Sequence, residues 1–320
     1  MATSDRSQMK DSSLGKGKFL RLLNHIQRGT LADRFVWEWR KRLKQRRSKW
    51  WNSQVGKREY FDIKIDRGVR MRLHFDSELS RLIYVDDFER TEREFLKKFL
   101  KPGDLFVDIG ANIGLFSLIA ARAIGPSGKV FAFEPTGRIY GRLTHSVRLN
   151  AFQNISCFRL ALSDRTGQQD FFMYKDGFDA WNSFALPASG WAFKHERVAC
   201  ETWDCFALAN DLLGKVVMVK LDVEGWEARV LRGAAQTLRR DDAPLMQVEF
   251  TDAAAASAGS SCKDLYRILE DFGYLMFVYD PRKGELVHDP LRENYPYNNV
   301  IATKNPEEAN LRLVKGSKWS

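Results

Sequence analysis

The sequence predicts an α/β protein built on a doubly wound, mostly parallel sheet, and three neighbouring features predict it. An apolar run at residues 104–109 is followed by a loop of small residues and then by an apolar, helix-like run, Leu115–Ile124. A second apolar run follows at residues 129–133 and ends in Glu134. Strand, tight loop and helix in this order place backbone N–H groups and a helix N-terminus at the carboxyl end of a strand, where such sheets hold nucleotide-like ligands.

The loop and the acid after the second strand together indicate a ligand site. Gly110 and Gly114 permit a close approach of the backbone and can take a positive φ without a Cβ penalty. Asn112 stands where a dinucleotide loop has its middle glycine, and the third glycine of that fingerprint is missing. Glu134 is placed to accept hydrogen bonds from both ribose hydroxyls. The alternative for Glu134 is that it caps the following helix.

The other elements follow in order along the chain. Residues 60–65 and 69–75 alternate apolar and polar side chains around Asp-Arg-Gly, which predicts a β-hairpin. Residues 90–100 predict an amphipathic helix that ends at Lys-Pro-Gly, and we expect its acids and Glu89 to be solvated. The later elements are expected to be helices at 137–150 and 262–272 and strands at 155–160, 169–174, 195–201, 216–221, 245–250, 274–279 and 298–302.

The strand at 216–221 ends in an unusual group of charges. Lys220, Asp222 and Glu224 lie at its carboxyl end. Three charged residues at that end of a buried parallel strand are rarely there for packing, so we expect them to lie above a ligand. Glu249 lies inside the apolar run 245–250, and the burial of its charge requires a partner.

Four motifs in order carry a resemblance to a known family. VDIGANIG, FAFEP, VKLDVEGWEARVLRGA and MQVEF resemble the FkbM family of S-adenosylmethionine-dependent methyltransferases. The resemblance covers residues 60–303 and takes in TWDCF, which is similar to that family's T-L-D-D-L segment. It implies a Rossmann-like class I methyltransferase fold. In that fold a seven-stranded, mostly parallel sheet has an antiparallel last strand, and here an N-terminal helical and hairpin extension precedes it.

The resemblance also implies S-adenosyl-L-methionine as the cofactor. The expected cofactor site consists of Asp108, Gly110, Asn112, Gly114, Glu134, Ser163 and Asp164. The glycine loop would face the methionine part, the first acid would anchor the loop or the amino group, and Glu134 would hold the ribose. Ser163 and Asp164 follow a strand at the adenine position, although residues 163–167 fit a simple turn equally well. The acids near residue 90 are an alternative contact for the methionine end.

The chemistry is expected at the carboxyl end of the strand 216–221. Methyl transfer from a sulfonium is an in-line displacement, in which alignment supplies much of the acceleration. A hydroxyl acceptor must also lose its proton, which requires a general base or a metal-lowered pKa. We expect Asp222 and Glu224 to lie nearest the methyl group, and Lys220 either to hold one of them or to stabilise a developing alkoxide. Two acids two residues apart are weak support for a divalent ion, so no metal site is expected.

The domain organisation is expected to have four parts. These are a basic, partly disordered extension with an amphipathic helix (1–58), a hairpin and helix leading into the core (59–100), the methyltransferase domain (101–305) and a tail (306–320). An aromatic insert at 168–203 interrupts the βα order and is a candidate acceptor wall. Trp181, Asn182 and Ser183 in the insert suit stacking against, and hydrogen bonding to, a sugar-like acceptor. The alternative is that the aromatic residues of the insert only fill space.

Positive charge is concentrated at the N-terminus. Residues 1–58 hold 16 Lys and Arg against 4 Asp and Glu, a charge of +12; the whole chain carries +10, so residues 59–320 carry −2. A nearly neutral body argues against nucleic acid as a partner of the core. A basic helix with tryptophans at 31–51 can lie on an anionic membrane surface, and the alternative is that its apolar stripe packs on the body.

The sequence predicts a cytoplasmic protein that is at most peripheral at the inner face of a membrane. It contains no apolar run long enough to span a bilayer and no apolar leader. Its four cysteines lack metal-ligand spacing and are expected to be reduced.

These features favour O-methylation of a hydroxyl group on a sugar, a surface glycan or glycolipid, or a secondary metabolite. The oxygen acceptor follows from the resemblance and not from particular residues. One alternative is an NAD-dependent oxidoreductase, which lacks support because the third glycine of the dinucleotide-binding loop is missing. The other is a non-catalytic protein with a cofactor fold that its basic N-terminus recruits to a membrane. The sequence does not indicate an oligomeric state.

Overall fold

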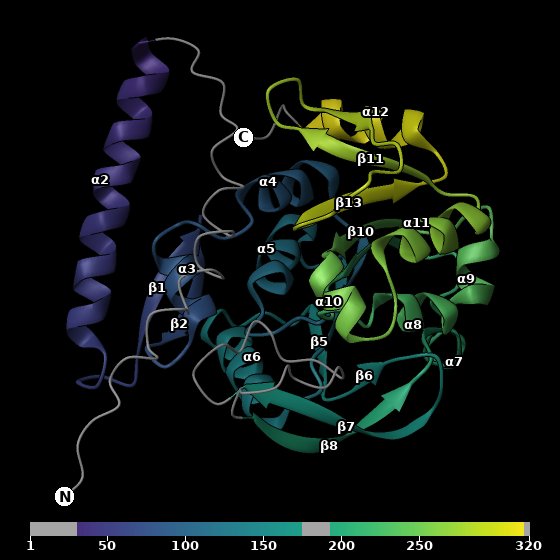
Figure 1. The fold of residues 1–320 in the computed structure, drawn as a ribbon, viewed down its shortest axis with the longest axis horizontal. Coiled ribbons are helices and arrows are strands. Elements are labelled where there is room, and N and C mark those ends of the chain that lie inside the picture. The colour runs from purple at the N-terminus through teal and green to yellow at the C-terminus, as the bar shows by residue number, and fades with distance from the viewer. Residues whose placement is uncertain (1–30, 175–192, 317–320) are drawn as a thin grey trace, which may run out of the picture. The chain divides into compact units, whose positions relative to one another are not determined.

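The computed structural model of the protein describes residues 31–174 and 193–316 (Figure 1). The chain divides into two compact units, Met1–Lys49 and Trp50–Ser320, which are described separately. The described part of the first unit belongs to the long helix α2 (Leu31–Gln54), on which Trp37 and Trp39 are exposed. None of the described helices is long and apolar enough to cross a bilayer.

The second unit is organised around an eight-stranded sheet of order β12-β11-β13-β10-β9-β3-β4-β5. Its strands are β3 (Leu105–Ile109), β4 (Lys129–Phe133), β5 (Ile155–Phe158), β9 (Val216–Leu221), β10 (Leu245–Phe250), β11 (Leu275–Asp280), β12 (Glu285–His288) and β13 (Asn298–Thr303). The pairs from β10 through β9, β3 and β4 to β5 are parallel, whereas β13 is antiparallel to both β10 and β11. The expected Rossmann-like order with an antiparallel last strand is confirmed.

The expected count of seven strands is wrong, because β12 adds an eighth strand at the edge. This strand is four residues long and pairs with β11 alone. Its sequence, Glu-Leu-Val-His, follows a turn and offers one buried apolar residue, Leu286. Such a short run has too little periodicity to be predicted from sequence.

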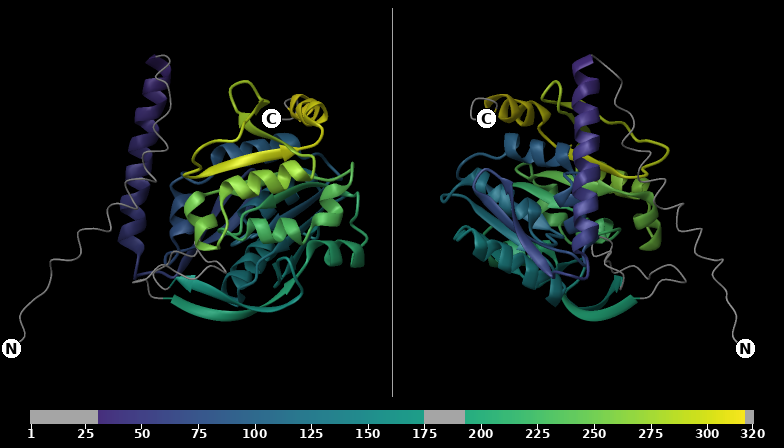
Figure 2. Two further views of the ribbon diagram at one scale, coloured as in Figure 1. Left: turned by 45° about the vertical axis from the view of Figure 1, so that its right-hand side comes forward. Right: turned by 90° about the vertical axis from the view of Figure 1, so that its left-hand side faces the viewer.

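Helices cover both faces of the sheet (Figures 1 and 2). They are α3 (Glu78–Tyr84), α4 (Arg90–Phe99), α5 (Leu115–Ile124), α6 (Gly137–Leu149), α7 (Trp203–Ala209), α8 (Glu227–Arg232), α9 (Ala235–Arg239), α10 (Asp252–Ser257), α11 (Cys262–Asp271) and α12 (Pro306–Gly316). The strands carry apolar residues on both sides, as expected for a parallel sheet covered on two faces. Alternate strand residues therefore belong to two different hydrophobic clusters.

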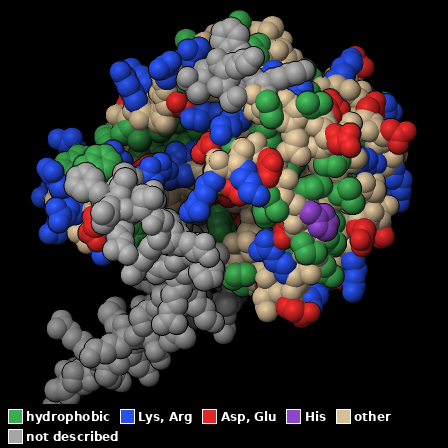
Figure 3. Space-filling model, turned by 90° about the horizontal axis from the view of Figure 1, so that it is seen from above, with side chains coloured by type: hydrophobic (Ala, Val, Ile, Leu, Met, Phe, Trp, Pro, Cys, Tyr) green, Lys and Arg blue, Asp and Glu red, His purple; other side chains and the backbone are tan. Residues whose placement is uncertain are grey.

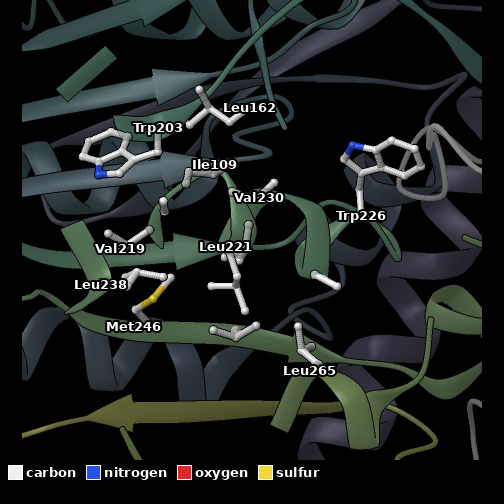
Figure 4. Close-up of a cluster of buried hydrophobic side chains, with 14 of the residues drawn as sticks. Ile109, Leu162, Trp203, Val219, Leu221, Trp226, Val230, Leu238, Met246 and Leu265 are labelled. Carbon is white, nitrogen blue, oxygen red and sulfur yellow. The ribbon is translucent and has the colours of Figure 1, made fainter. Parts of the chain in front are cut away.

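The first cluster joins the sheet to helices α7, α8 and α11. Ile109, Val219 and Met246 from three neighbouring strands meet Val230 of α8 and Leu265 of α11 (Figure 4). The second cluster lies on the opposite face, under helices α4, α5, α6 and α12. Three polar residues, Asp108, Lys220 and Glu249, belong to strands β3, β9 and β10 and alternate with residues of the first cluster.

A hairpin of β1 (Tyr60–Asp66) and β2 (Val69–His74) precedes the sheet, as predicted. It packs on an aromatic cluster made of Trp50, Trp51, Phe61, Phe75 and Tyr84. Trp51 is 2% exposed, and its ring centroid lies 4.6 Å from that of Phe75. The last turn of α2 is therefore part of the folded body.

The insert contributes a separate three-stranded sheet of order β6-β8-β7, formed by β6 (Ala161–Leu162), β7 (Gly167–Tyr174) and β8 (Phe193–Glu201). The two long strands pair in antiparallel register from Gly167 with Cys200 to Tyr174 with Phe193. Trp181, Asn182 and Ser183, the predicted acceptor residues, lie outside the described residues. Their role stays a prediction.

Candidate active site

The glycine loop joins β3 to α5 and is held by both neighbouring strands. The N–H groups of Gly110 and Ala111 donate to the carbonyl of Phe133 in β4, and Asp222 N–H donates to the carbonyl of Ile109. Gly110 has φ +83°, and a Cβ there would lie 1.8 Å from the backbone oxygen of Asp222. This glycine is required because the loop crosses directly over the end of β9.

Three of the predicted residues in this loop have a left-handed backbone conformation. Asn112 has φ +48° and Gly114, which precedes α5, has φ +93°. Asn112 is among the residue types that tolerate this region, which explains its place between two glycines with positive φ. The loop consequently presents its turn at the carboxyl edge of the sheet.

Asp108 anchors the loop to the helix that follows. The side chain is 1% exposed, and the Ser117 hydroxyl of α5 donates to its Oδ2 at 2.5 Å. Burial raises the pKa of Asp108, although the charge of Lys220 and the bond from Ser117 oppose this shift. The bond from Ser117 is the kind of contact that a loop anchor makes, and the contact of Asp108 with the amino group of the cofactor stays a prediction.

Glu134 lies at the end of β4 and is 7% exposed. Its Oε1 accepts from the backbone N–H of Thr136 at 3.0 Å and from the Thr136 hydroxyl at 2.7 Å. Thr136 is the N-cap residue of α6. One carboxylate oxygen therefore supports the start of this helix, as in the alternative interpretation, and this contact also fixes the side chain at the edge where a ribose is expected.

Ser163 contacts the N-cap residue of α8, and Asp164 contacts a residue within that helix. Ser163 is 0% exposed, and its hydroxyl accepts from the indole N–H of Trp226 at 3.0 Å. Asp164 pairs with Arg229 at 3.0 Å. These contacts give both residues a structural role, and their predicted contact with adenine stays a prediction.

Lys220 is the centre of a buried ionic network. It is 3% exposed, and its Nζ lies 2.5 Å from Asp222 Oδ2 and 3.8 Å from Glu89 Oε2. Burial alone would lower the pKa of Lys220, but the charges of Asp222, Glu89 and Asp108 outweigh burial and raise it. Burial would raise the pKa of Asp222, and the charge of Lys220 outweighs it, so that pKa is lowered. Lys220 and Asp222 therefore form a charged pair, and the expectation that the lysine holds one of the acids agrees with this contact.

Glu89 belongs to this network, and the expectation that it is a solvated charge is wrong. It is 9% exposed, with φ +41°, immediately before α4. Its Oε1 accepts from the Tyr297 hydroxyl at 2.7 Å and from Asn299 Nδ2 at 3.3 Å. Burial raises the pKa of Glu89 to about 7 despite the nearby Lys220. Sequence analysis missed the pair because Glu89 and Lys220 are far apart in the chain.

Asp222 and Glu224 lie together as predicted, and Glu249 of β10 joins them. One side-chain oxygen from each of the three carboxylates lies within 4.8 Å of the other two, an arrangement that could hold a metal ion. Glu224 has φ +53° in the turn after β9, where the Glu227 carboxylate accepts from the N–H groups of Val223 and Gly225. Burial, followed by the neighbouring acids, raises the pKa of Glu224 well above its ordinary value.

A cavity of about 200 Å³ lies beside this network, between α4 and strands β10, β11 and β13. Its polar lining consists of Thr91, Glu92, Gln247, Tyr297, Asn298 and Asn299. Gln247 is 0% exposed, and neither atom of its amide has a hydrogen-bond partner among the described residues. Tyr297 both lines this cavity and bonds Glu89, so the cavity and the ionic network are contiguous.

Comparison with known proteins gives a family match over the core. A model of the methyltransferase FkbM domain matches residues 108–276, which is more than half of the chain and contains the loop, Glu134, Lys220, Asp222 and Glu249. Two relatives match over shorter segments. The AMB antimetabolite synthetase AmbE of Pseudomonas aeruginosa is 40% identical over 87 residues, which are 27% of this chain and 4% of that protein. The methyltransferase sdnD of Sordaria araneosa is 39% identical over 69 residues, 21% of this chain and 26% of that protein.

Solved structures overlap the chain only loosely. A SAM-dependent methyltransferase from Aquifex aeolicus has a TM-score of 0.39 and 13% identity, over 71% of this chain and 93% of its own. The fibrillarin of Aeropyrum pernix, in complex with natively bound S-adenosyl-L-methionine, has a TM-score of 0.36 and 18% identity, over 66% and 73%. The functional conclusion therefore depends on the family match and on the site.

Proposed function

Because the chain belongs to the FkbM family of S-adenosylmethionine-dependent methyltransferases, we propose that it transfers the methyl group to a hydroxyl of a sugar, a glycan or glycolipid, or a secondary metabolite. The observation that supports an oxygen acceptor is the buried network of Lys220, Asp222 and Glu89 next to a polar cavity. A hydroxyl must lose a proton during transfer, and buried carboxylates at the transfer point can receive it.

The residues at the sheet edge fit S-adenosylmethionine. This cofactor supplies an electrophilic methyl group on a positively charged sulfur, and it also carries an ammonium group and a ribose diol. Carboxylates can pair with the sulfonium and the ammonium group of the cofactor, and they can accept hydrogen bonds from the two ribose hydroxyls. The site contains two buried acids of this kind, Asp108 at the end of β3 and Glu134 at the end of β4. The loop between them has glycine at both ends, so no side chain projects from Gly110 or Gly114.

Asp222, Glu224 and Lys220 are the residues that we assign to the reaction. Lys220 donates to Asp222 Oδ2 at 2.5 Å, which fixes that carboxylate and lowers its pKa. A fixed acid beside a buried cation keeps its orientation when the acceptor enters, so little reorganisation is needed during transfer. The network as a whole takes up the hydroxyl proton, with Glu224 beside Asp222 in the same turn.

We propose that the methyl acceptor binds in the cavity next to α4. Its lining combines hydroxyl and amide groups with the carboxyl group of Glu92, and these supply the hydrogen-bond donors and acceptors that a polyhydroxylated ligand requires. The buried amide of Gln247 needs a hydrogen-bonding partner that the described residues do not provide. An acceptor hydroxyl would satisfy it.

A membrane surface is the proposed location of the acceptor. Helix α2 carries Trp37 and Trp39, which are 45% and 57% exposed, among Lys and Arg side chains. The body itself is nearly neutral, and the face shown in Figure 3 intermingles acidic and basic side chains. Binding to vesicles that contain anionic lipid, compared with neutral vesicles and with a variant lacking residues 1–49, tests this proposal.

The reaction is tested with tritium-labelled S-adenosylmethionine and extracts of cells that lack the gene. A glycan, lipid or metabolite that gains label and the mass of one CH₂ group identifies the acceptor. We expect Asp222→Asn to lower kcat by roughly 100-fold or more, with cofactor affinity changed little. Glu134→Ala is expected to weaken cofactor binding by calorimetry instead. Binding of NAD in place of S-adenosylmethionine would contradict the proposal, as would label on nitrogen or carbon alone.

A further inference from the structure

Three carboxylates from two neighbouring strands converge above the sheet. Asp222 and Glu224 follow β9, and Glu249 lies near the end of β10, which pairs with β9 in parallel. One oxygen from each lies within 4.8 Å of the others. The sequence placed only two acids together here, and the third comes from a strand that begins 24 residues after β9 ends.

Glu249 lacks a full set of partners. It is 4% exposed, its Oε1 accepts from the Thr251 hydroxyl at 2.8 Å, and its Oε2 has no hydrogen-bond donor among the described residues. A buried carboxylate oxygen without a donor is costly, so something absent from the protein chain is expected to contact it.

Asp222 does not supply the missing donor. The pKa of Asp222 is lowered, so its carboxylate is ionised and only accepts hydrogen bonds. Lys220 does not supply it either, because its contacts are with Asp222 Oδ2 and Glu89. Asp222 keeps a second oxygen that Lys220 does not hold.

We propose that Asp222, Glu224 and Glu249 bind one hard divalent cation of the Mg²⁺, Mn²⁺ or Ca²⁺ class. Carboxylate oxygens are the ligands such ions prefer, at about 2.0–2.6 Å. Two oxygens on one ion are then at most about 5 Å apart, so a span of 4.8 Å allows all three acids to reach the same ion after small adjustments. Water or acceptor oxygens complete the coordination.

A shared proton is the competing explanation, and it satisfies fewer groups. One proton bridges only two oxygens, for instance those of Asp222 and Glu249, and does not join the carboxylate of Glu224 to them. A cation contacts all three. The cofactor's own positive charge is a second competitor, so the decisive measurement is made without S-adenosylmethionine.

The role of the ion in methyl transfer depends on the proposed function, whereas the site itself does not. An ion held here binds an acceptor hydroxyl and lowers its pKa, so that the hydroxyl proton passes to a carboxylate or to water more readily. The positive charge of the ion would also offset the mutual repulsion of the three carboxylates.

The test measures Mn²⁺ binding to the full-length protein by calorimetry and by electron paramagnetic resonance, with Mg²⁺ and Ca²⁺ as competitors. We expect one site with a Kd below about 1 mM, the weak end of protein sites for such ions. Glu249→Gln is expected to weaken binding by roughly tenfold or more, since even the loss of groups that only orient ligands has that size of effect.

Glu89→Gln is the matched control, because it replaces another buried carboxyl group, next to Lys220, but removes no proposed ligand. It should retain Mn²⁺ binding within a few-fold. Equal losses in both variants, or no Mn²⁺ bound up to 1 mM, would overturn the proposal. Glu224→Gln serves as a second ligand variant if Glu249→Gln unfolds, as judged by thermal melting. Metal-independent labelling of an acceptor would refute the ion's role and leave the methyltransferase assignment intact.

Discussion

The sheet edge at β9 and β10 and the aromatic cluster around Trp51 differ in what they bury. At the edge, Lys220 and Glu249 are buried ionisable groups, and Glu249 and Gln247 carry polar atoms without partners among the described residues. In the aromatic cluster, Trp50, Trp51 and three further rings contact one another directly. The first region retains groups that weaken the fold unless a ligand binds, whereas the second supplies stability.

The largest expected effect comes from truncating the aromatic cluster. Trp51→Ala should lower the free energy of unfolding by about 3–5 kcal/mol, because it leaves a large cavity against Phe61 and Phe75. Urea unfolding followed by circular dichroism measures this loss. Trp39→Ala is the matched control, since Trp39 is 57% exposed, and it should change stability by no more than about 0.5 kcal/mol. Similar losses in the two variants would mean that the cluster is not a main source of stability.

Sequence analysis was most successful where one strand or helix determines the answer. The apolar runs at Val216–Leu221 and Leu245–Phe250 match β9 and β10, and Leu115–Ile124 matches α5. The requirement that buried Glu249 have a partner also follows from its own strand. Local patterns of this kind are dictated by burial on both faces of a parallel sheet.

Sequence analysis failed where a contact joins distant segments. Glu89 looks like a solvated helix charge until the fold brings it 3.8 Å from Lys220. Tyr297 immediately precedes β13, and its hydroxyl donates to Glu89, which is 208 positions earlier in the chain. No spacing rule relates residues that are more than a hundred positions apart. Such pairs depend on topology and not on local pattern.

His74 of β2 provides a pH-dependent test of the hairpin region. Burial, followed by the charge of Arg142, lowers the pKa of His74 to about 4 from an ordinary value of 6.5. The unfolded chain therefore binds a proton at a pH where the folded protein does not. The stability is complete above pH 6.5 and is lost as the pH falls from about 6.5 towards 4.

We expect the loss from His74 to reach roughly 1–2 kcal/mol after allowance for the partial exposure of the ring. The measurement is the urea midpoint at several pH values for the wild-type protein and for His74→Gln. The variant should lose part of the pH dependence, while His288→Gln, a change at an exposed histidine, should keep it. An unchanged slope in His74→Gln would show that other groups control acid stability.

The smallest expected effect has the opposite sign and lies beside the ionic network. Gln247→Met keeps the size of a fully buried side chain and removes two polar atoms that have no partners among the described residues. It should raise the free energy of unfolding by about 1 kcal/mol, because the penalty for burying an unsatisfied amide disappears. The same change should weaken acceptor binding, seen as a higher KM for the acceptor and an unchanged affinity for S-adenosylmethionine. Gln236→Met, at an exposed position in α9, should change neither quantity. A less stable Gln247→Met protein would mean that the amide already contributes to the fold, and the contrast between a ligand-dependent edge and a self-sufficient aromatic cluster would then be lost.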